Sequence, residues 1–395
     1  MPTNDRGAGP KRPQPARAHA RRDRHAVAEH RSLADIPVRK KHCWTVLKIL
    51  IAKYNHQHTT KQKDVSFKTQ HERQRVLYQM FNDLRDRGYP IDPRSLGEFH
   101  IRKLVESWRA RSLAPGTLQD YLTALRTLAD WIGKPGLVRR LEYYVEDAER
   151  VQRGGVARHD KSWSGHGVDA RQKIGEITRY SEHAAVQLEL ALRYGMRVKE
   201  THMLQPHRAV IPAAETGLPH PSAEYYLRVS RGAKGGRQRY IPIDSDEKWQ
   251  AIARAKALAT PPDGHLGYPG LSLKRSLQKF YDIMKRFGIT QAELGATAHG
   301  LRHQYAHGRY KVRCGAEPPV RGGAPVEPAA DTEARLLVAE ELGHSRRQIT
   351  SAYCGSPARS AASTAPGRTG VVDPDPAAED SATLRVVAPQ TDHEA

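Results

Sequence analysis

The sequence predicts two domains: an all-α domain over residues 41–145 and a mixed, mainly α domain with a small antiparallel sheet over residues 175–355. Three observations carry this prediction. Apolar residues recur at helical spacing in the first region, a charged, glycine-containing stretch at 146–174 indicates a linker, and one hairpin pattern interrupts the second region. A chain of 395 residues is long enough to form two hydrophobic cores.

The first domain is predicted to consist of short helices. The segment Thr69–Glu72 has the Thr-x-x-Glu sequence of a capping box and predicts a helix that Gly88 ends. A second clear helix follows Pro115, and weaker helical patterns cover residues 42–54 and 98–112. The apolar residues that form one stripe along the two clear helices are Val76, Leu77, Met80, Phe81 and Leu84, then Leu118, Leu122, Leu125, Ala129 and Ile132.

The second domain contains one convincing pair of strands. Tyr225–Ser230 and Arg239–Ile243 are rich in strand-forming residues and flank the turn Gly232–Gly236, which predicts a β-hairpin. Farther along, the proline- and glycine-rich segment 315–330 predicts a loop.

The charge of the chain indicates a polyanionic partner. Lys and Arg outnumber Asp and Glu by 64 to 43, which gives a net charge of +21 and a pI near 9.9. Nucleic acid is the polyanion that such a charge most commonly serves. Residues 1–40 form a basic tail and residues 356–395 a mildly acidic one, and both compositions predict disorder.

The sequence offers no sign of secretion, membrane insertion or metal binding. Its three cysteines include no C-x-x-C pair, so neither a zinc site nor a disulfide framework is expected. The longest apolar stretch, Val46–Ala52, is too short to span a bilayer. With no Walker A sequence, no H-E-x-x-H and no carboxylate cluster, we expect no cofactor and no metal.

A series of basic and aromatic motifs runs through the second domain in a fixed order. The motifs are Gly195-Met-Arg197-Val-Lys-Glu200, Lys234 in the hairpin turn, His299-Gly-Leu-Arg302, Leu342-Gly-His344, and Tyr353 nine residues later. Any one of these motifs occurs by chance in many proteins. Five of them in order, at sensible spacing, form a specific signal.

This ordered series resembles the motifs of the tyrosine recombinase (phage integrase) family. The residues within the motifs are most similar to those of integrases of bacterial integrative elements. The resemblance covers residues 41–355 and includes the family's helical core-binding domain. It implies the tyrosine recombinase fold and a site-specific recombinase that integrates or excises a mobile element through a 3′-phosphotyrosyl intermediate. It also implies a homotetramer that acts on double-stranded DNA attachment sites together with accessory DNA-bending or directionality factors. The location that it implies is the bacterial cytoplasm, at the nucleoid.

The resemblance implies two arginines and a lysine that act on the phosphate. Arg197 and Arg302 clamp the non-bridging oxygens, whose negative charge suits planar guanidinium groups. Lys234 protonates the departing 5′-oxygen as a general acid. Its neighbours Arg231, Arg237 and Arg239 compete for that role.

The resemblance also assigns two histidines and the nucleophile. Tyr353 attacks the phosphorus, and His299 accepts the phenolic proton, because a phenol with a pKa near 10 is a weak nucleophile until it loses that proton. His344 donates a hydrogen bond to the phosphate, and Glu200 orients a basic neighbour. His303 is expected to be structural.

Three alternatives stay open at the level of sequence. Tyr305 and Tyr310 also follow the H-x-x-R motif, although they are interpreted more simply as packing or DNA-facing residues. The whole set suits a type IB topoisomerase, and a non-catalytic DNA-binding protein could retain the same fold. The 42-residue interval from Arg302 to His344 is long for the family, and the 315–330 segment is interpreted as an inserted loop.

Overall fold

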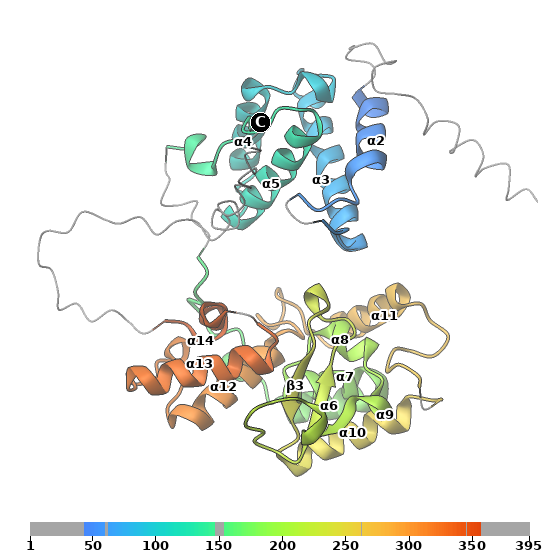
Figure 1. The fold of residues 1–395 in the computed structure, drawn as a ribbon, viewed down its shortest axis with the longest axis vertical. Coiled ribbons are helices and arrows are strands. Elements are labelled where there is room, and N and C mark those ends of the chain that lie inside the picture. The colour runs from blue at the N-terminus through green and yellow to red at the C-terminus, as the bar shows by residue number, and fades with distance from the viewer. Residues whose placement is uncertain (1–42, 60–61, 147–153, 262, 345, 357–395) are drawn as a thin grey trace, which may run out of the picture. The chain divides into compact units, whose positions relative to one another are not determined.

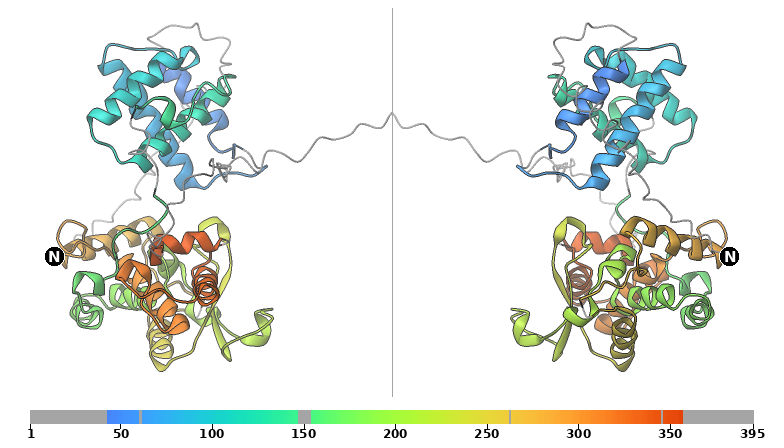
Figure 2. Two further views of the ribbon diagram at one scale, coloured as in Figure 1. Left: turned by 90° about the vertical axis from the view of Figure 1, so that its left-hand side faces the viewer. Right: turned by 90° about the vertical axis from the view of Figure 1, so that its right-hand side faces the viewer.

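The computed structural model describes residues 43–59, 62–146, 154–261, 263–344 and 346–356. The chain separates into two compact units, divided between Gly154 and Gly155 (Figures 1 and 2). Apart from Ser356, the two predicted tails lie outside the described residues. Each unit is considered by itself below.

Within its described residues, unit 1 is built from helices, which confirms the predicted all-α domain. Its elements are α2 (Cys43–Tyr54), α3 (Phe67–Asp86), η3 (Pro93–Ser95), α4 (Glu98–Ala110), α5 (Pro115–Trp131) and η4 (Leu141–Tyr143). The 3-10 turns η3 and η4 lie before α4 and after α5, respectively.

The start of α3 differs from the sequence prediction. Ser66 is the N-cap, and its hydroxyl accepts a hydrogen bond from the backbone N of Thr69 at 3.2 Å. The predicted capping box at Thr69 and Glu72 is therefore wrong. Glu72 pairs with Arg75 at 3.1 Å instead, because the helix has already begun at Phe67 and both residues lie on its exposed surface. At the other end Gly88 has a φ of +83° just beyond the helix, as predicted.

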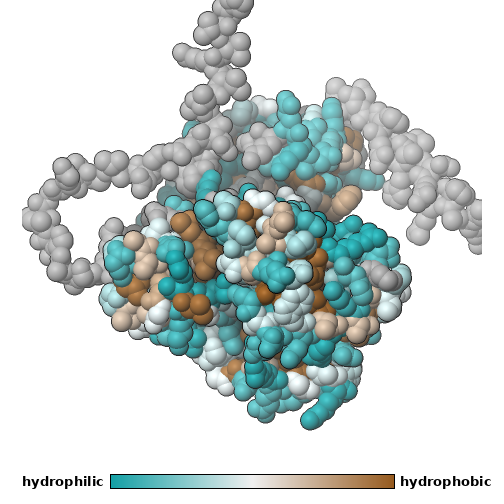
Figure 3. Space-filling model, turned by 60° about the horizontal axis from the view of Figure 1, so that its bottom comes forward, coloured by the Kyte–Doolittle hydropathy of each residue, from teal (hydrophilic) through white to brown (hydrophobic). Residues whose placement is uncertain are grey.

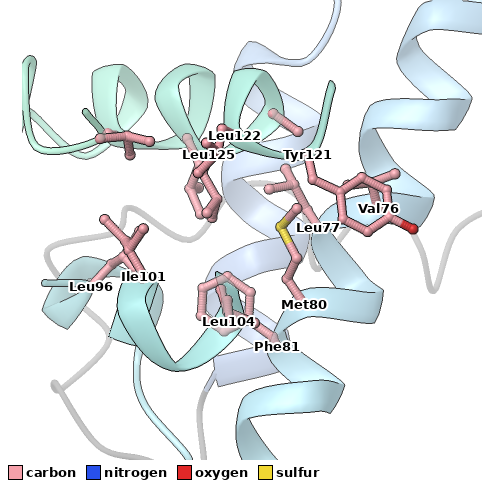
Figure 4. Packing of buried hydrophobic residues seen from close by; sticks show 14 of the residues in the cluster. Val76, Leu77, Met80, Phe81, Leu96, Ile101, Leu104, Tyr121, Leu122 and Leu125 are labelled. Atoms are coloured by element: carbon pink, nitrogen blue, oxygen red, sulfur yellow. The ribbon is translucent and has the colours of Figure 1, made fainter. Parts of the chain in front are cut away.

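The predicted apolar stripes form the core of unit 1. Figure 4 shows Leu122 and Leu125 of α5 facing Leu77 and Met80 of α3, with Leu104 of α4 beside them. All five side chains are almost completely buried. Complete burial of a side chain of this kind contributes about 1.5–3 kcal/mol, so the stripe positions are what hold the helices together.

Unit 2 is mixed but mainly helical. Its elements are η6 (Ser164–His166), α6 (Ala170–Thr178), α7 (Glu182–Tyr194), α8 (Val198–Met203), α9 (Pro206–Ala209), β1 (Val210–Pro212), η7 (Ala213–Glu215), β2 (Tyr225–Val229), η8 (Lys234–Gly236), β3 (Arg239–Pro242), α10 (Asp246–Leu258), α11 (Leu273–Arg286), α12 (Gly300–Cys314), η9 (Pro319–Arg321), α13 (Pro328–Glu341), η10 (Arg347–Thr350) and α14 (Ser351–Cys354).

The small antiparallel sheet of unit 2 is confirmed. Strands β2 and β3 form the predicted hairpin, with Tyr226 opposite Pro242 and Val229 opposite Arg239. The sequence did not reveal β1, which pairs with β2 and makes the strand order β1-β2-β3. Three residues are too few to show the alternation that identifies a strand.

Helix α7 is the central helix of unit 2. One side of it packs into a core with the sheet, through Val186, Leu190 and Tyr194. Its other side packs into a second core, through Ala184 and Leu188. Helices α12, α13 and α14 lie together in one part of the unit, and the sheet with α8 to α10 lies in another (Figure 1).

Residues assigned to the linker by sequence include part of unit 2. Trp163 is fully buried, and its indole nitrogen donates to the carbonyl of Thr297 at 2.8 Å. Helix α6 already begins at Ala170, capped by the Asp169 carboxylate. The charged, glycine-containing composition of 146–174 gave no indication of this packing.

The face of the molecule drawn in Figure 3 is largely polar. Hydrophilic side chains cover most of the face drawn in Figure 3, and its apolar patches are small and separated. In the part of the chain that the structure describes, no helix has the length and hydrophobicity needed to cross a bilayer.

Candidate active site

The turn between α7 and α8 positions Arg197. Gly195 ends α7 with a φ of +58°, and a Cβ there would lie 2.5 Å from the ring of Tyr305. Both facts call for glycine at this position. The chain then enters α8 with Arg197 as its N-cap, and the Glu200 carboxylate accepts from the Arg197 backbone N and from its Nη1, each at 2.7 Å.

Glu200 is a fully buried carboxylate held between two arginines. Arg239 of β3 donates to it through Nη1 at 3.0 Å and Nη2 at 2.6 Å. Burial by itself raises the pKa of Glu200, but the hydrogen bonds and charges of Arg239 and Arg197 outweigh it and hold the pKa at about 2. The ionised carboxylate therefore fixes the Arg197 side chain, which is the geometry expected of a residue that orients a basic neighbour.

Arg239 is a site residue that the sequence analysis did not identify as the partner of Glu200. Its Nε donates to the carbonyl of Glu341 at 2.8 Å, so it joins β3 to the end of α13. The signal in the sequence was a charged residue at a strand position that should face a core. Arg239 is 5 % exposed, and burial at that level requires a paired partner.

Arg302 lies at the centre of the site. Helix α12 begins at Gly300, where a Cβ would lie 2.6 Å from the carbonyl oxygen of Lys161 and 2.8 Å from Trp163. This close approach buries the first turn of the helix, and with it Arg302, which is 0 % exposed. Burial first, and then the charges of Arg197 and Arg239, lower the pKa of Arg302 to about 10, so it stays charged at neutral pH.

The guanidinium of Arg302 contacts three other segments. It donates to the carbonyl of Gly195 through Nη1, to the carbonyl of Leu342 at 2.6 Å through Nη2, and to the phenol oxygen of Tyr353 at 3.1 Å through Nε. Arg302 thus joins the turn before α8, the end of α13 and helix α14. The structure brings Arg197, Arg302, His344 and Tyr353 together around this contact.

Tyr353 and His344 meet beside Arg302. Tyr353 lies on α14 with 7 % exposure, and His344 follows α13 through Gly343, whose φ is +70°. The His344 Nε2 lies 3.4 Å from Arg302 Nη2 and 3.3 Å from the Tyr353 oxygen. Because a guanidinium can only donate, Nε2 of His344 is an acceptor in this arrangement and can also accept from the phenol. Ser345, the residue after His344, lies outside the described residues.

His299 lies at the N-cap of α12, where part of the residue remains open to solvent. Its ring centroid is 5.5 Å from that of His303 and 6.4 Å from that of Tyr353, so His299 lies near the phenol without a hydrogen bond to it. Loss of solvent around the ring, followed by the charges of Arg302 and Arg197, lowers the pKa of His299 to about 4. The imidazole is therefore neutral near pH 7 and able to accept a proton.

His303 lies against the nucleophile candidate. Its ring centroid is 4.7 Å from that of Tyr353, and the residue is 6 % exposed. Burial, and then the neighbouring His299 and His307, lower the pKa of His303 to about 3. A buried neutral ring packed on the tyrosine suits the structural role expected from the sequence.

Lys234 is placed by its backbone alone. It begins η8 in the turn between β2 and β3, as the hairpin pattern predicted. Gly232 brings this turn close to α8, because a Cβ at Gly232 would lie 2.9 Å from the carbonyl oxygen of Lys199 and 3.2 Å from the Cα of Glu200. The position of the Lys234 side chain lies outside the described part of the chain.

The hydroxyls of the two rival tyrosines are bonded to carboxylates. Tyr305 donates to Glu341 at 2.7 Å, and Tyr310 donates to Asp331 at 2.5 Å. Burial, and then these carboxylates, raise the pKa of both phenols far above 10. Neither of these two phenols forms a phenolate readily.

Among the described residues, no group of three or more His, Cys, Asp or Glu side chains is placed to hold a metal ion. The described cysteines are all free thiols, and burial raises the pKa of Cys354, the neighbour of Tyr353, to about 12.

The chain is similar to several solved integrase structures. One is a lambda integrase (residues 75–356) dimer bound to a COC′ core site, with 15 % identity, a TM-score of 0.47, and coverage of 85 % of this chain and 100 % of that one. Another is the Tn1549 transposon integrase in complex with a circular intermediate DNA, with 15 % identity, a TM-score of 0.47, and coverage of 77 % and 93 %. A third is a lambda integrase tetramer bound to a Holliday junction, with 15 % identity, a TM-score of 0.47, and coverage of 87 % of each chain.

Two family models match the chain and decide its family. The model described as phage integrase, N-terminal, matches residues 52–138, and the model described as integrase matches residues 167–308. No curated protein sequence shows significant similarity to the chain. The two matches follow each other in order and together cover more than half of the 395 residues. The chain therefore belongs to the phage integrase family, the tyrosine recombinases.

Proposed function

We propose that the chain cuts and rejoins DNA at specific sites, with Tyr353 as the nucleophile that forms a 3′-phosphotyrosyl intermediate. The observation that carries the proposal is the 3.1 Å contact between Arg302 Nε and the Tyr353 oxygen. It holds the phenol against Arg302, a completely buried guanidinium whose charge suits a phosphodiester, and Arg197 adds a second positive charge in the neighbourhood of Arg302.

In the first step one bond forms, one bond breaks and two protons are transferred. The Tyr353 oxygen attacks phosphorus, a phosphotyrosyl bond forms at the DNA 3′ end, and the bond to the 5′-oxygen breaks. The phenolic proton passes to a histidine, and Lys234 supplies a proton to the departing 5′-oxygen. Arg197 and Arg302 stabilise the negative charge that develops on the non-bridging oxygens. A 5′-hydroxyl of a partner strand then attacks the phosphotyrosine and releases Tyr353.

Two histidines can receive the phenolic proton. His299 is neutral at neutral pH because its pKa is near 4, which supports the role that the sequence assigned to it. His344 lies closer to the phenol, with Nε2 at 3.3 Å, and can share the role before it donates to the phosphate. Comparison of H299A with H344A identifies the general base. The variant that lacks the base should lose cleavage at pH 7 and regain it at alkaline pH.

The partners follow from the family and the charge. A net charge of +21 supports binding to double-stranded DNA attachment sites, largely through phosphate contacts that weaken with salt. We propose that the chain acts as a homotetramer on two such sites, integrates or excises a mobile element, and works with accessory DNA-bending or directionality factors in the bacterial cytoplasm, at the nucleoid.

A nicked suicide substrate tests the proposal. Cleavage next to the nick releases a short oligonucleotide, so the covalent protein–DNA adduct accumulates and is visible on a denaturing gel. The substrate carries the attachment sequence that flanks the gene's own element. We expect an adduct with the wild type and with the surface control Y180F, and none with Y353F. Absence of an adduct from the wild type, or an undiminished adduct from Y353F, contradicts the proposal.

A further inference from the structure

We infer that His307 is a positioning residue for Tyr353, braced by Asp160 and by the loop between α12 and α13. The inference rests on the proposed role of Tyr353 as the nucleophile. Nε2 of His307 lies 2.9 Å from the backbone carbonyl oxygen of Tyr353. A carbonyl oxygen only accepts, so Nε2 is the donor.

Helix α12 therefore holds Tyr353 at two points. Arg302 contacts its phenol oxygen, and His307, five residues later on the same helix, contacts its backbone. His307 is 1 % exposed, so its ring has little freedom to turn. The side chain and the main chain of Tyr353 are thus both held by α12. This one helix therefore fixes how close the phenol oxygen lies to Arg302.

Helix α14 needs such support because it is short. It runs from Ser351 to Cys354, and a helix of one turn is not stable by itself. The backbone N of Ala157 donates to the carbonyl of Ser351 at 2.8 Å, and Arg335 donates to the carbonyl of Gly355 at 2.9 Å. The two ends of α14 are thus tied to separate segments, and the His307 bond lies between them.

Asp160 braces the far side of the His307 ring. Its Oδ1 lies 3.6 Å from His307 Nδ1, a nitrogen with no hydrogen-bond partner in the described part of the chain. Because burial lowers the pKa of His307 and Nε2 carries the ring proton, Nδ1 has no proton to donate, and Asp160 restrains the ring by packing alone. The same carboxylate accepts from the backbone N of Ser162 at 2.7 Å and lies 3.4 Å from Arg321 Nε. Asp160 is therefore fixed by its own segment and by the loop that contains Arg321.

The loop between α12 and α13 has a second contact with the nucleophile segment. Val320 of η9 packs against Gly355, where a Cβ would lie 2.9 Å from the Val320 backbone N. The extra residues that lengthen the interval between Arg302 and His344 therefore lie directly against the end of α14. The loop reaches Tyr353 by two routes, one through Val320 and one through Arg321, Asp160 and His307.

The simpler explanation is that His307 only fills the core. Two substitutions distinguish this explanation from a role in positioning Tyr353. In H307Q, the glutamine Nε2 is the same number of bonds from Cβ as the histidine Nε2, so the donor can be kept. H307L keeps the bulk and loses the donor. A misplacement of about 1 Å costs up to about 10²-fold in rate, which sets the scale for H307L.

The test is the single-turnover rate of adduct formation at saturating protein, with DNA affinity and thermal midpoint measured in parallel on the full chain. We expect H307Q to keep most of the wild-type rate and H307L to lose up to about 10²-fold, with unchanged DNA affinity in both. Equal rates for the two variants, whether both wild-type or both slow, overturn the inference.

A second pair of variants covers the case in which H307L does not fold. R321A removes the arginine beside Asp160, whereas K311A breaks the 2.7 Å ion pair with Glu317 at the edge of the same loop. R321A should cleave more slowly than K311A, and equal rates overturn the inference. If Y353F forms adducts as the wild type does, the proposed function itself fails. If Y353F is inactive while H307L equals H307Q, the role of His307 alone fails.

Discussion

Arg302 Nε lies 3.1 Å from the phenol oxygen of Tyr353, although 51 positions separate the two residues in the chain. The same guanidinium donates to the backbone carbonyls of Gly195 and Leu342. A side chain that joins the nucleophile candidate to two backbone turns both assembles the site and supplies its charge.

Replacement of Arg302 by lysine should abolish most of the cleavage while the charge is retained. Lysine has one ammonium group and cannot reproduce three donors in a fixed plane. We expect the single-turnover rate of adduct formation to fall on the order of 10²–10³-fold. The exposed Arg171, changed to lysine, serves as the control and should cleave normally. A wild-type rate for R302K would remove Arg302 from the catalytic set.

The role of Lys234 as the general acid can be tested by changing the leaving group. As the general acid, its loss in K234A should cost about 10²–10⁴-fold on ordinary DNA. A substrate with sulfur in place of the bridging 5′-oxygen needs no proton on departure, so K234A should cleave it almost as fast as the wild type does. R237A, a neighbour in the same turn, should show no such selective rescue. Failure of the sulfur substrate to rescue K234A would assign the acid to another residue.

The pH dependence of cleavage tests His299. A group that accepts a proton must be unprotonated, so the contribution of His299 is present above its folded-state pKa and lost as the pH falls through about 4. The rate at saturating protein should therefore show no fall that depends on His299 between about pH 8 and about pH 5. A fall centred near pH 6.5, the ordinary value for histidine, that disappears in H299A would contradict this prediction.

Glu200 should be important for stability as well as for the placement of Arg197. E200Q removes the charge between Arg197 and Arg239 and leaves two arginines without a carboxylate, one of them buried. Loss of one partner of a buried ion pair typically costs about 3–5 kcal/mol. Urea denaturation should show this loss in free energy of unfolding. E247Q, at an exposed ion pair, should leave the midpoint unchanged, and equal midpoints for the two variants would contradict the prediction.

The sequence was most informative where chemistry depends on residues close together in the chain. Arg197 follows a helix that Gly195 ends, Arg302 lies three residues after His299, and Tyr353 lies nine after His344. Each spacing places a side chain at the end or on one face of a local element. The hairpin around Lys234 was predictable for the same reason, because its turn and strands are continuous in sequence.

The rest of the site depends on contacts that no local pattern records. Arg239 meets Glu200 across 39 positions, and His307 meets the Tyr353 backbone across 46. Arg239 was noted in the sequence as a competitor of Lys234, because a basic residue beside a turn resembles a DNA contact until its burial is known. Trp163 lay inside a charged stretch, and its burial under α12 shows only in three dimensions.

The most direct test of the central claim is the identity of the residue that carries the DNA. After trapping on a nicked substrate, the adduct is digested with nuclease and protease, and the modified peptide is sequenced by mass spectrometry. We predict a single nucleotide-linked tyrosine, Tyr353. A nucleotide on Tyr305, on Tyr310 or on any other residue would contradict the assignment of Tyr353 as the nucleophile.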